Sequence, residues 1–373
     1  MTSSESTPAI TQVTVVGLGL MGASLALAIR KFHPGLRLTG CDVQAQVGAE
    51  ALRLGMIDEF QELESLDASG SQLVFVATPV GIIANVVRRL ARRVNPPWIV
   101  TDVGSTKAAI QTELRAELPA GFCYIGGHPM CGSDLEGLEG ADPYLYENAV
   151  YILTPDDRVP PERLQLLETF LGKLGATVLK MDADTHDSIV ACTSHLPYLA
   201  AVGLVSTFVG NFEGQREAHT LAAGGFHDTT RIAGCPPAIW RDICLSNRHH
   251  VLKAVRQMVI ELESLGDAIS SSDGERLLKI FSRARNLRAS LPPYRKGLLP
   301  TPHELVIKAQ DRPGFIGEIA GVLGQAGVNI RDIQVLRVRE GEGGALAIAL
   351  AGEDELNKAL ELLEGAGFVA RRR

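Results

Sequence analysis

The stretch GGHPMCGSD, residues 126–134, gathers side chains that could do chemistry into a short, glycine-rich segment. His128 stands three residues before Cys131, and the two could hold a metal, form a nucleophilic pair or provide a proton acceptor. A metal site lacks further ligands at plausible spacing, and a nucleophilic cysteine needs a lowered thiol pKa that residue types do not show. A neutral imidazole can take up a proton near neutral pH, so a general base and a structural turn residue remain as alternatives for His128.

A glycine-rich turn near the start of the chain indicates a cofactor with which such a base could act. GLGLMG places Gly17, Gly19 and Gly22 at G-x-G-x-x-G spacing, between an apolar run and an alanine-rich helix. Such glycines allow a tight turn, close approach of a pyrophosphate and close helix packing, whereas a turn without a ligand is the alternative. Asp42 follows Gly22 by twenty residues, where a carboxylate accepts hydrogen bonds from ribose hydroxyls and repels a 2′-phosphate. We therefore expect NAD, rather than NADP, as the cofactor.

Alternating strands and helices must position these residues. Apolar runs at QVTVV, LRLTGCD, QLVFVATP, WIVTDVGS and NAVYILTP predict a doubly wound, mostly parallel α/β sheet of the Rossmann type over residues 10–181. Ligands bind at the edge formed by the carboxyl ends of such strands. Further cofactor-binding candidates at this edge are Leu20, Met21, Thr78, Pro79 and Asp102.

Helical periodicity replaces the strands over residues 182–290. No formal charge occurs between Asp187 and Glu213, so this segment is long enough to span a bilayer. Its polar residues, and the lack of a second such segment, favour a buried helix at a subunit interface instead. We expect an all-helical substrate and dimerisation domain, a homodimer and no membrane span.

A linker and a third domain complete the predicted organisation. Residues 291–302 contain four prolines and a glycine, which is typical of an interdomain linker. Residues 303–373 follow the order strand, helix, strand, strand, helix, and the terminal Arg371–Arg373 are expected to be solvated.

Composition excludes several classes of protein. A formal charge of −7 without a basic stripe argues against a nucleic-acid partner. The six cysteines form no C-x-x-C pair, which argues against a zinc site or a disulfide framework. The first twelve residues lack the features of a secretory signal. Together these observations predict a cytoplasmic protein with reduced thiols and no bound metal.

Six motifs in order carry a resemblance to a known family. GLGLMG, DVGSTK, GGHPMCGS, TSHLPY, GGFHDTTRIA and PPAIWRDI, spread from residue 12 to about residue 290, resemble the prephenate dehydrogenase family of tyrosine biosynthesis. The resemblance implies an NAD-dependent oxidoreductase that converts prephenate to 4-hydroxyphenylpyruvate with loss of carbon dioxide.

The resemblance also implies roles for individual residues. His128 would accept the proton of the ring 4-hydroxyl as hydride leaves the same carbon, and Ser105 would hydrogen-bond that hydroxyl and orient the histidine. Arg231 would hold a substrate carboxylate, which a guanidinium fork does with two parallel N–H donors. An ion pair between Arg231 and Asp228 is the alternative for that arginine.

Substrate contacts are expected from the helical domain. His195 matches a pocket histidine of the family, and Tyr198 stands where some members carry a second histidine. Trp240 and Asn247 follow at family-like spacing, although core packing is an equal alternative for Trp240. Asp228 completes these substrate-binding candidates, while Cys131 stands where the family commonly has alanine.

The C-terminal segment DRPGFIGEIAGVLGQAGVNI resembles an ACT domain, a small ferredoxin-like regulatory module that often binds amino acids. The resemblance implies an effector site near Gly314 and Asn329 and allosteric regulation, with L-tyrosine as the natural effector. A module used only for dimerisation is the alternative.

Three other functions compete with the main prediction. Arogenate, the amino-acid analogue of prephenate, is the nearest alternative substrate and would make the protein an arogenate or cyclohexadienyl dehydrogenase. 3-Hydroxyacid dehydrogenases and imine reductases join similar domains, but GGHPM and DTTRIA are not expected in them. A sensor that retains the fold without its chemistry conflicts with the joint presence of Ser105, His128 and Arg231.

Overall fold

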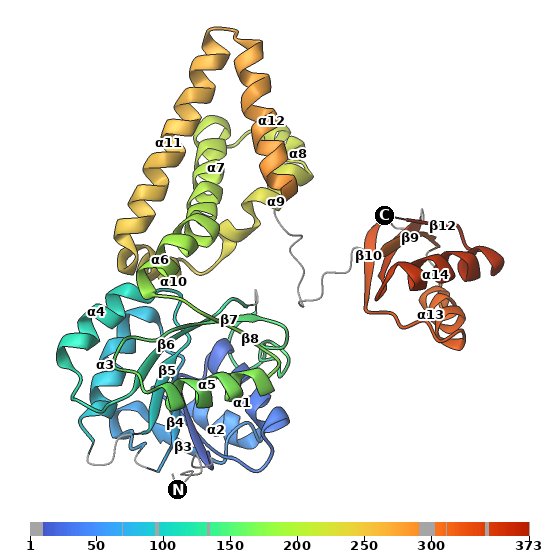
Figure 1. The fold of residues 1–373 in the computed structure, drawn as a ribbon. Helices are drawn as coiled ribbons and strands as arrows, with labels where there is room; N and C mark the ends of the chain where they lie inside the picture. Colours follow the sequence, from blue (N-terminus) through green and yellow to red (C-terminus); the bar gives the residue numbers. More distant parts are fainter. Residues whose placement is uncertain are drawn as a thin grey trace, which may run out of the picture. The chain divides into compact units, whose positions relative to one another are not determined.

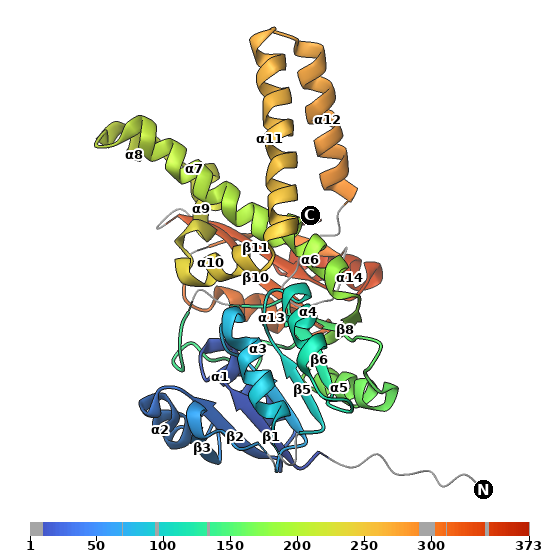
Figure 2. The same ribbon diagram turned by 90° about the vertical axis from the view of Figure 1, so that its left-hand side faces the viewer.

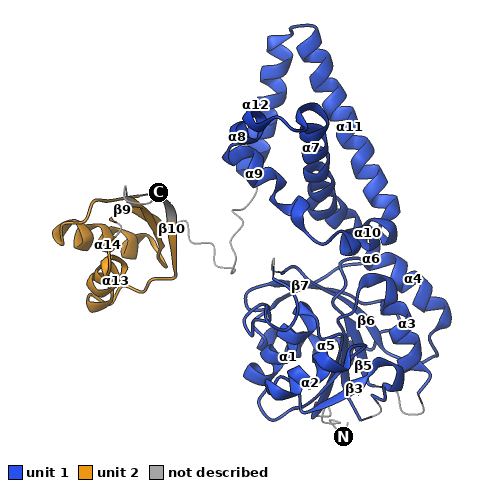
Figure 3. Ribbon diagram, turned by 180° about the vertical axis from the view of Figure 1, so that it is seen from behind, with its two compact units in different colours: residues 1–291 blue, residues 292–373 orange. Residues whose placement is uncertain are grey.

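The computed structural model separates into two compact units, Met1–Leu291 and Pro292–Arg373 (Figure 3). The predicted linker at 291–302 lies outside the residues that the structure describes, which are 10–68, 70–93, 97–132, 135–290, 303–310, 312–339 and 343–372.

An eight-stranded sheet with the order β3-β2-β1-β4-β5-β6-β7-β8 forms the base of the first unit (Figure 1). All neighbouring strands are parallel except β6 and β7, which confirms the predicted doubly wound, Rossmann-like architecture. The strands are β1 Gln12–Val16, β2 Arg37–Asp42, β3 Glu59–Glu62, β4 Leu73–Val76, β5 Ile99–Asp102, β6 Tyr124–Pro129, β7 Val150–Thr154 and β8 Thr177–Lys180.

Helices cover both faces of this sheet, so its central strands place buried apolar residues on both faces. One face packs against α1 and α5, which contribute Ile29 and Phe170, and the other against α3 and α4, which contribute Val87 and Leu114. The helices of this region are α1 Leu20–Phe32, α2 Ala45–Arg53, α3 Val80–Ala91, α4 Ala108–Glu117 and α5 Pro161–Lys173, and Leu63–Ser65 form a short 3-10 turn, η1.

Strand β6, which carries His128, is one that apolar patterning missed. Gly126 and Gly127 lower its strand propensity, yet both are needed because neighbouring atoms lie close to the backbone. A Cβ on Gly127 would lie 2.4 Å from the carbonyl oxygen of Asp102. This close packing of β6 against β5 fixes where the strand delivers His128.

Residues 182–290 are helical, as periodicity predicts (Figure 1). α11 and α12 form a long antiparallel hairpin. α7 leads away from this hairpin toward α8 (Figure 2). The helices are α6 Ala183–Val190, α7 Leu196–Phe212, α8 Arg216–Leu221, α9 Gly224–Thr230, α10 Pro237–Ser246, α11 Arg248–Ser270 and α12 Gly274–Ser290, joined by a π-helical turn η2 Ala191–His195 and a 3-10 turn η3 Arg231–Gly234.

α6, η2 and α7 form one continuous helical segment, Ala183–Phe212. Pro197 has no backbone N–H, and its ring would collide with the carbonyl four residues earlier in a regular α-helix, so the chain widens into the π turn just before it. The segment is long and apolar enough to cross a membrane by length and composition alone, and 28% of its apolar window is buried within one chain.

The second unit is a four-stranded antiparallel sheet with the order β10-β11-β9-β12, covered by two helices. Leu305, Ile319 and Leu356 belong to its separate apolar core. Ala370–Arg372 pair with β9, so part of the arginine tail expected to be merely solvated is an edge strand. The elements are β9 Glu304–Ala309, α13 Phe315–Gln325, β10 Asp332–Arg339, β11 Gly343–Ala349, α14 Glu353–Gly365 and β12 Ala370–Arg372.

Candidate active site

The glycine turn between β1 and α1 is as tight as its sequence predicts. Gly17 has φ +92, and a Cβ there would lie 2.6 Å from the carbonyl oxygen of Ala77. A Cβ on Gly22 would lie 1.8 Å from the carbonyl oxygen of Gly17. A Cβ on Gly19 would meet no atom within 4 Å, so the space beside this residue is open to a ligand.

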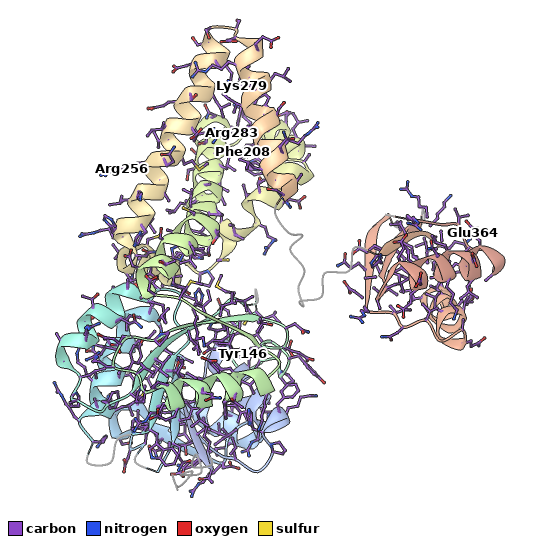
Figure 4. The ribbon with its side chains drawn as sticks, in the orientation of Figure 1. Tyr146, Phe208, Arg256, Lys279, Arg283 and Glu364 are labelled. Carbon is purple, nitrogen blue, oxygen red and sulfur yellow. The ribbon has the colours of Figure 1, made fainter. Side chains whose placement is uncertain are left out.

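The first turn of α1 is built to receive an anion. Gly19 precedes the helix and supplies no side-chain cap, and no acidic residue lies in the first turn. The N–H groups of that turn, at the positive end of the helix dipole, are therefore left for a ligand phosphate. The buried side chain of Tyr146 donates a hydrogen bond of 2.8 Å to the carbonyl oxygen of Met21 in this first turn. Tyr146 is labelled in Figure 4.

Asp42 ends β2 beside the same turn. Its carboxylate accepts a hydrogen bond of 2.8 Å from the Leu18 N–H and one of 3.0 Å from the Gln44 N–H. Each carboxylate oxygen has further acceptor capacity, so this arrangement orients Asp42 and still allows bonds to ribose hydroxyls.

A cavity of about 940 Å³ runs from this turn to the helical region. The hydroxyl oxygen of Thr78 is buried with no hydrogen-bond partner in the described part of the chain, so a ligand in the cavity would satisfy it. These features fit a dinucleotide. The lining brings together predicted cofactor and substrate residues, namely Gly19, Leu20, Met21, Thr78, Pro79, Ser105 and Arg231.

The side chain of Asp102, a predicted cofactor-binding residue, is fully buried and is directed toward protein partners. Its carboxylate pairs with the ammonium of Lys107 and accepts hydrogen bonds from the Tyr124 hydroxyl at 2.6 Å and the Gly104 N–H at 2.7 Å. Burial lowers the pKa of Lys107, and the Asp102 charge opposes this effect. Asp102 thus holds the loop that carries Ser105.

His128 belongs to a chain of polar groups that motif spacing did not reveal. Its Nδ1 lies 2.8 Å from Nε2 of His186, and Nδ1 of His186 lies 2.7 Å from Oδ1 of Asp187. Asp187 also accepts the N–H groups of Lys107 at 2.8 Å and Ala108 at 2.9 Å, at the start of α4. One carboxylate therefore ties α6 to α4 and, through His186, to β6.

The environment of His128 keeps its imidazole neutral. Burial lowers the pKa of His128 well below its ordinary value, and His186, Lys107 and His195 lower it further. No hydrogen bond joins His128 to Ser105 within the described residues, although Ser105 lines the cavity. A neutral imidazole with one free nitrogen can accept a proton.

The structure also bears on the thiol and metal alternatives for the GGHPMCGSD stretch. Burial raises the pKa of Cys131 to about 12, so its thiol stays protonated and is a poor nucleophile. No group of three or more His, Cys, Asp or Glu side chains suited to a metal occurs in the described ranges.

The predicted substrate residues of the helical region form a second cluster. Tyr198 stacks on Trp240 with ring centroids 3.8 Å apart, and His195 meets the edge of Trp240 at 6.1 Å. Asn247 Nδ2 donates to the Asp187 carbonyl oxygen at 2.7 Å and lies 3.3 Å from His195 Nδ1. Because the carbonyl fixes Asn247 as the donor, His195 accepts at Nδ1 and carries its own proton on Nε2.

Arg231 and Asp228 lie on adjoining elements of the helical region. Arg231 begins η3 and lines the cavity, whereas Asp228 is exposed on α9. In the second unit, Gly314 has φ +84 at the start of α13, and Asn329 is exposed in the loop before β10.

Sequence reasoning missed His186, Asp187 and Lys107. Asp182 caps the segment that follows through a 2.8 Å bond from the Thr185 N–H, so ADTHDSIV resembles an ordinary helix start. The available signal was an adjacent His-Asp pair at the head of a long segment without charges.

Comparison with known proteins assigns each of the three parts of the chain to a domain family. Family models match residues 25–180 as the prephenate dehydrogenase nucleotide-binding domain, residues 182–283 as its dimerization domain and residues 303–368 as an ACT domain.

Full-length relatives and solved structures agree with these matches. Prephenate dehydrogenase of Bacillus subtilis is 33% identical over 94% of this chain and 95% of its own. A crystal structure of A. aeolicus prephenate dehydrogenase with hydroxyphenyl propionate and NAD+ is 29% identical, with TM-score 0.71 over 76% of this chain and 99% of its own. Synechocystis arogenate dehydrogenase is 31% identical, with TM-score 0.65 over 74% of this chain and 99% of its own. The chain belongs to the prephenate dehydrogenase family.

Proposed function

We propose that this chain oxidises prephenate with NAD to 4-hydroxyphenylpyruvate, carbon dioxide and NADH. The observation that carries the proposal is a cavity of about 940 Å³, whose lining includes Gly19 at the open turn together with Ser105 and Arg231. Hydride acceptor and substrate would meet there, and bound NAD supplies the hydride acceptor. Free thiols at all six cysteines support the expected reduced, cytoplasmic setting.

His128 is the proposed general base. Its free Nε2 takes the proton of the ring 4-hydroxyl while that carbon loses hydride and its bond to oxygen becomes a carbonyl. The ring carboxylate then leaves as carbon dioxide, its bonding electrons complete the aromatic ring, and the ring oxygen regains a proton. Aromatisation makes the reaction effectively irreversible.

Ser105 and Arg231 position the substrate. Ser105 lies on a loop that is held at both ends. The backbone N–H of Gly104 donates to the Asp102 carboxylate, and the backbone N–H of Lys107 donates to the Asp187 carboxylate. Its hydroxyl hydrogen-bonds the substrate hydroxyl. Arg231 pairs with a substrate carboxylate at the cavity wall. His195, Tyr198, Asp228, Trp240 and Asn247 are proposed to complete the substrate pocket.

The test of this function is NADH formation with prephenate, arogenate and a 3-hydroxy acid. His128→Asn keeps a polar group near the Nδ1 position but removes Nε2, so kcat should fall about 10²- to 10⁴-fold. His249→Asn, at an exposed histidine on α11, is the control and should retain wild-type kcat. Nearly full activity in His128→Asn would defeat the role of His128, and a clear preference for another substrate would defeat the assignment to prephenate.

We also propose a homodimer formed through the helical region. Large apolar side chains on α7, α11 and α12 are exposed in the single chain, and a soluble monomer rarely leaves so many together. They include Leu204, Val209, Phe212, Val259, Ile260, Leu262, Ile269, Leu278, Phe281 and Leu287.

L-Tyrosine is the proposed effector of the second unit. The ACT match and the exposed, left-handed Gly314 before α13 support a small-molecule site near Gly314 and Asn329. Regulation requires that tyrosine binding and catalysis be coupled energetically.

A further inference from the structure

The hydrogen-bonded chain of Asp187, His186 and His128 has a direction that its chemistry determines. Asp187 is its fixed end, because the carboxylate accepts backbone N–H groups from Lys107 and Ala108. Oδ1 of Asp187 accepts the backbone N–H of Lys107 and lies 2.7 Å from Nδ1 of His186, so it also accepts a hydrogen bond from His186. Nδ1 of His186 therefore carries a proton.

That assignment passes to His128. A neutral His186 with its proton on Nδ1 has a lone pair on Nε2, which can only accept a hydrogen bond. The 2.8 Å contact then requires Nδ1 of His128 to donate. Nε2 of His128, which lies on the side of the ring away from the fully buried His186, therefore keeps its lone pair.

The reverse direction would need His186 to be a cation that donates from both nitrogens. His186 is fully buried, and the ammonium of Lys107, also fully buried, lies close enough to influence His128. A second positive charge among these buried groups would cost more than the neutral arrangement.

We propose that His186 and Asp187 are positioning residues that hold His128 with its proton on Nδ1 and present the unprotonated Nε2 to the substrate. The inference rests on the proposed function, since it concerns how His128 is prepared to take the hydroxyl proton. Once that proton reaches Nε2, His128 is an imidazolium whose Nδ1–H already points along the chain toward the Asp187 charge. Catalytic histidines on other folds are oriented by the same logic.

His195, in the cluster with Trp240 and Asn247, has the opposite tautomer to His128. The proton assignment is therefore specific to each histidine. His195 accepts from Asn247 at its Nδ1 and so presents an N–H at Nε2. The site would therefore offer the substrate an acceptor from His128 and a donor from His195, each set by a buried neighbour.

The first test uses the ligand-free, full-length wild-type protein with ¹⁵N-labelled histidine. Long-range ¹H–¹⁵N spectra distinguish protonated from bare ring nitrogens, and the His128 signals are assigned by their loss in His128→Asn. We expect the proton on Nδ1 and a bare Nε2. A proton on Nε2 of His128 would overturn the proposal. This measurement involves no substrate, so it is independent of whether prephenate is the substrate.

The second test compares two replacements of His186. His186→Gln can still accept from His128 and donate to Asp187, whereas His186→Leu fills the space without a polar atom. We expect kcat to fall about 10²-fold in the leucine variant, with KM for NAD unchanged, and to recover to within about tenfold of wild type with glutamine. In the leucine variant the fixed protonation of His128 Nδ1 should be lost.

A matched control is a histidine of α11 that pairs with a carboxylate on α6, the helix of His186. Asp184 pairs with His250 at 2.9 Å outside this chain of groups, so His250→Leu removes a histidine–carboxylate pair and should leave kcat unchanged. A folded His186→Leu protein with kcat within threefold of wild type would refute the proposal. If the leucine variant fails to fold, the wild-type spectrum and the glutamine variant decide the matter.

Discussion

The carboxylate of Asp42 accepts a hydrogen bond of 2.8 Å from the backbone N–H of Leu18, inside the glycine turn. A second bond of 3.0 Å from the Gln44 N–H fixes its other oxygen. The negative charge is thus held at one place beside the turn, where the ribose of a dinucleotide is expected.

Asp42 should therefore decide the choice between NAD and NADP. Like charges brought together cost several kcal/mol, which corresponds to a preference for NAD of about 10²-fold or more in kcat/KM. Asp42→Asn removes the charge while keeping one acceptor, and should narrow that preference at least tenfold. Steady-state kinetics with each cofactor provide the measurement. A wild-type kcat/KM with NADP that equals or exceeds the value with NAD would contradict the assignment of NAD as the cofactor.

The two outer glycines of the motif should respond differently to alanine. Gly19→Ala places its Cβ in open space, so the melting temperature of the ligand-free protein should be unchanged while KM for NAD rises about tenfold. Gly22→Ala drives its Cβ into the Gly17 carbonyl, so it should unfold at lower temperature even without NAD. Thermal melts with and without NAD separate the two effects. An unchanged KM in Gly19→Ala would contradict the proposed pyrophosphate position.

Buried His195 should make folding stability depend on pH. Burial lowers its pKa from 6.5 to about 4, although the Asp187 charge opposes this. The unfolded chain therefore takes up a proton at this residue at higher pH than the folded chain does. The resulting stability is present above pH 6.5 and is lost as the pH falls from 6.5 to about 4.

The full effect amounts to about 3 kcal/mol at most, and the lowered pKa of His128 acts in the same direction. Urea unfolding at fixed protein concentration across this range measures the slope of stability against pH. His195→Gln should make the slope shallower, and His249→Gln controls for the loss of one imidazole. A slope that His195→Gln does not alter would contradict the burial of a neutral His195.

The exposed apolar side chains should hold two copies together. Light scattering at micromolar concentration should give the mass of a dimer. Leu262→Asp on α11 would bury two charges in a symmetric interface, so it should shift the protein toward monomer. Leu52→Asp on α2, where leucine is also exposed, is the matched control and should remain dimeric. Only monomer in the wild type would contradict this prediction.

Removal of residues 303–373 should abolish inhibition by L-tyrosine and leave kcat without tyrosine largely intact, since the second unit has a core of its own. Asn329→Ala should weaken inhibition in the full chain. Inhibition that persists unchanged after the deletion would place the tyrosine site in the catalytic region.

Sequence patterning predicted most of the fold because apolar periodicity is local. It found the strands that carry Asp42 and the helices after residue 182, and comparison with known structures bears out the three-part architecture. It missed β6, since Gly126 and Gly127 are selected by close packing against β5 and β7, which no local pattern records.

The site divides in the same way. Gly19 and Ser105 were predictable because each belongs to a motif at a strand end, and both line the cavity. Asp102 belongs to a motif too, but its partners Lys107 and Tyr124 turn its carboxylate inward. His186 stands 58 residues from His128, and only the folded chain brings their rings together.

The π turn before Pro197 lies within one continuous helical segment that carries both candidate active-site residues and exposed apolar residues. His186, Asp187 and His195 lie in the first half of the continuous segment Ala183–Phe212, and the exposed Leu204, Val209 and Phe212 lie in its second half. A partner subunit that packs against the second half of this segment also restrains the histidines in its first half. Assembly would then be a condition of catalytic alignment, and specific activity should decline upon dilution in step with the loss of dimer.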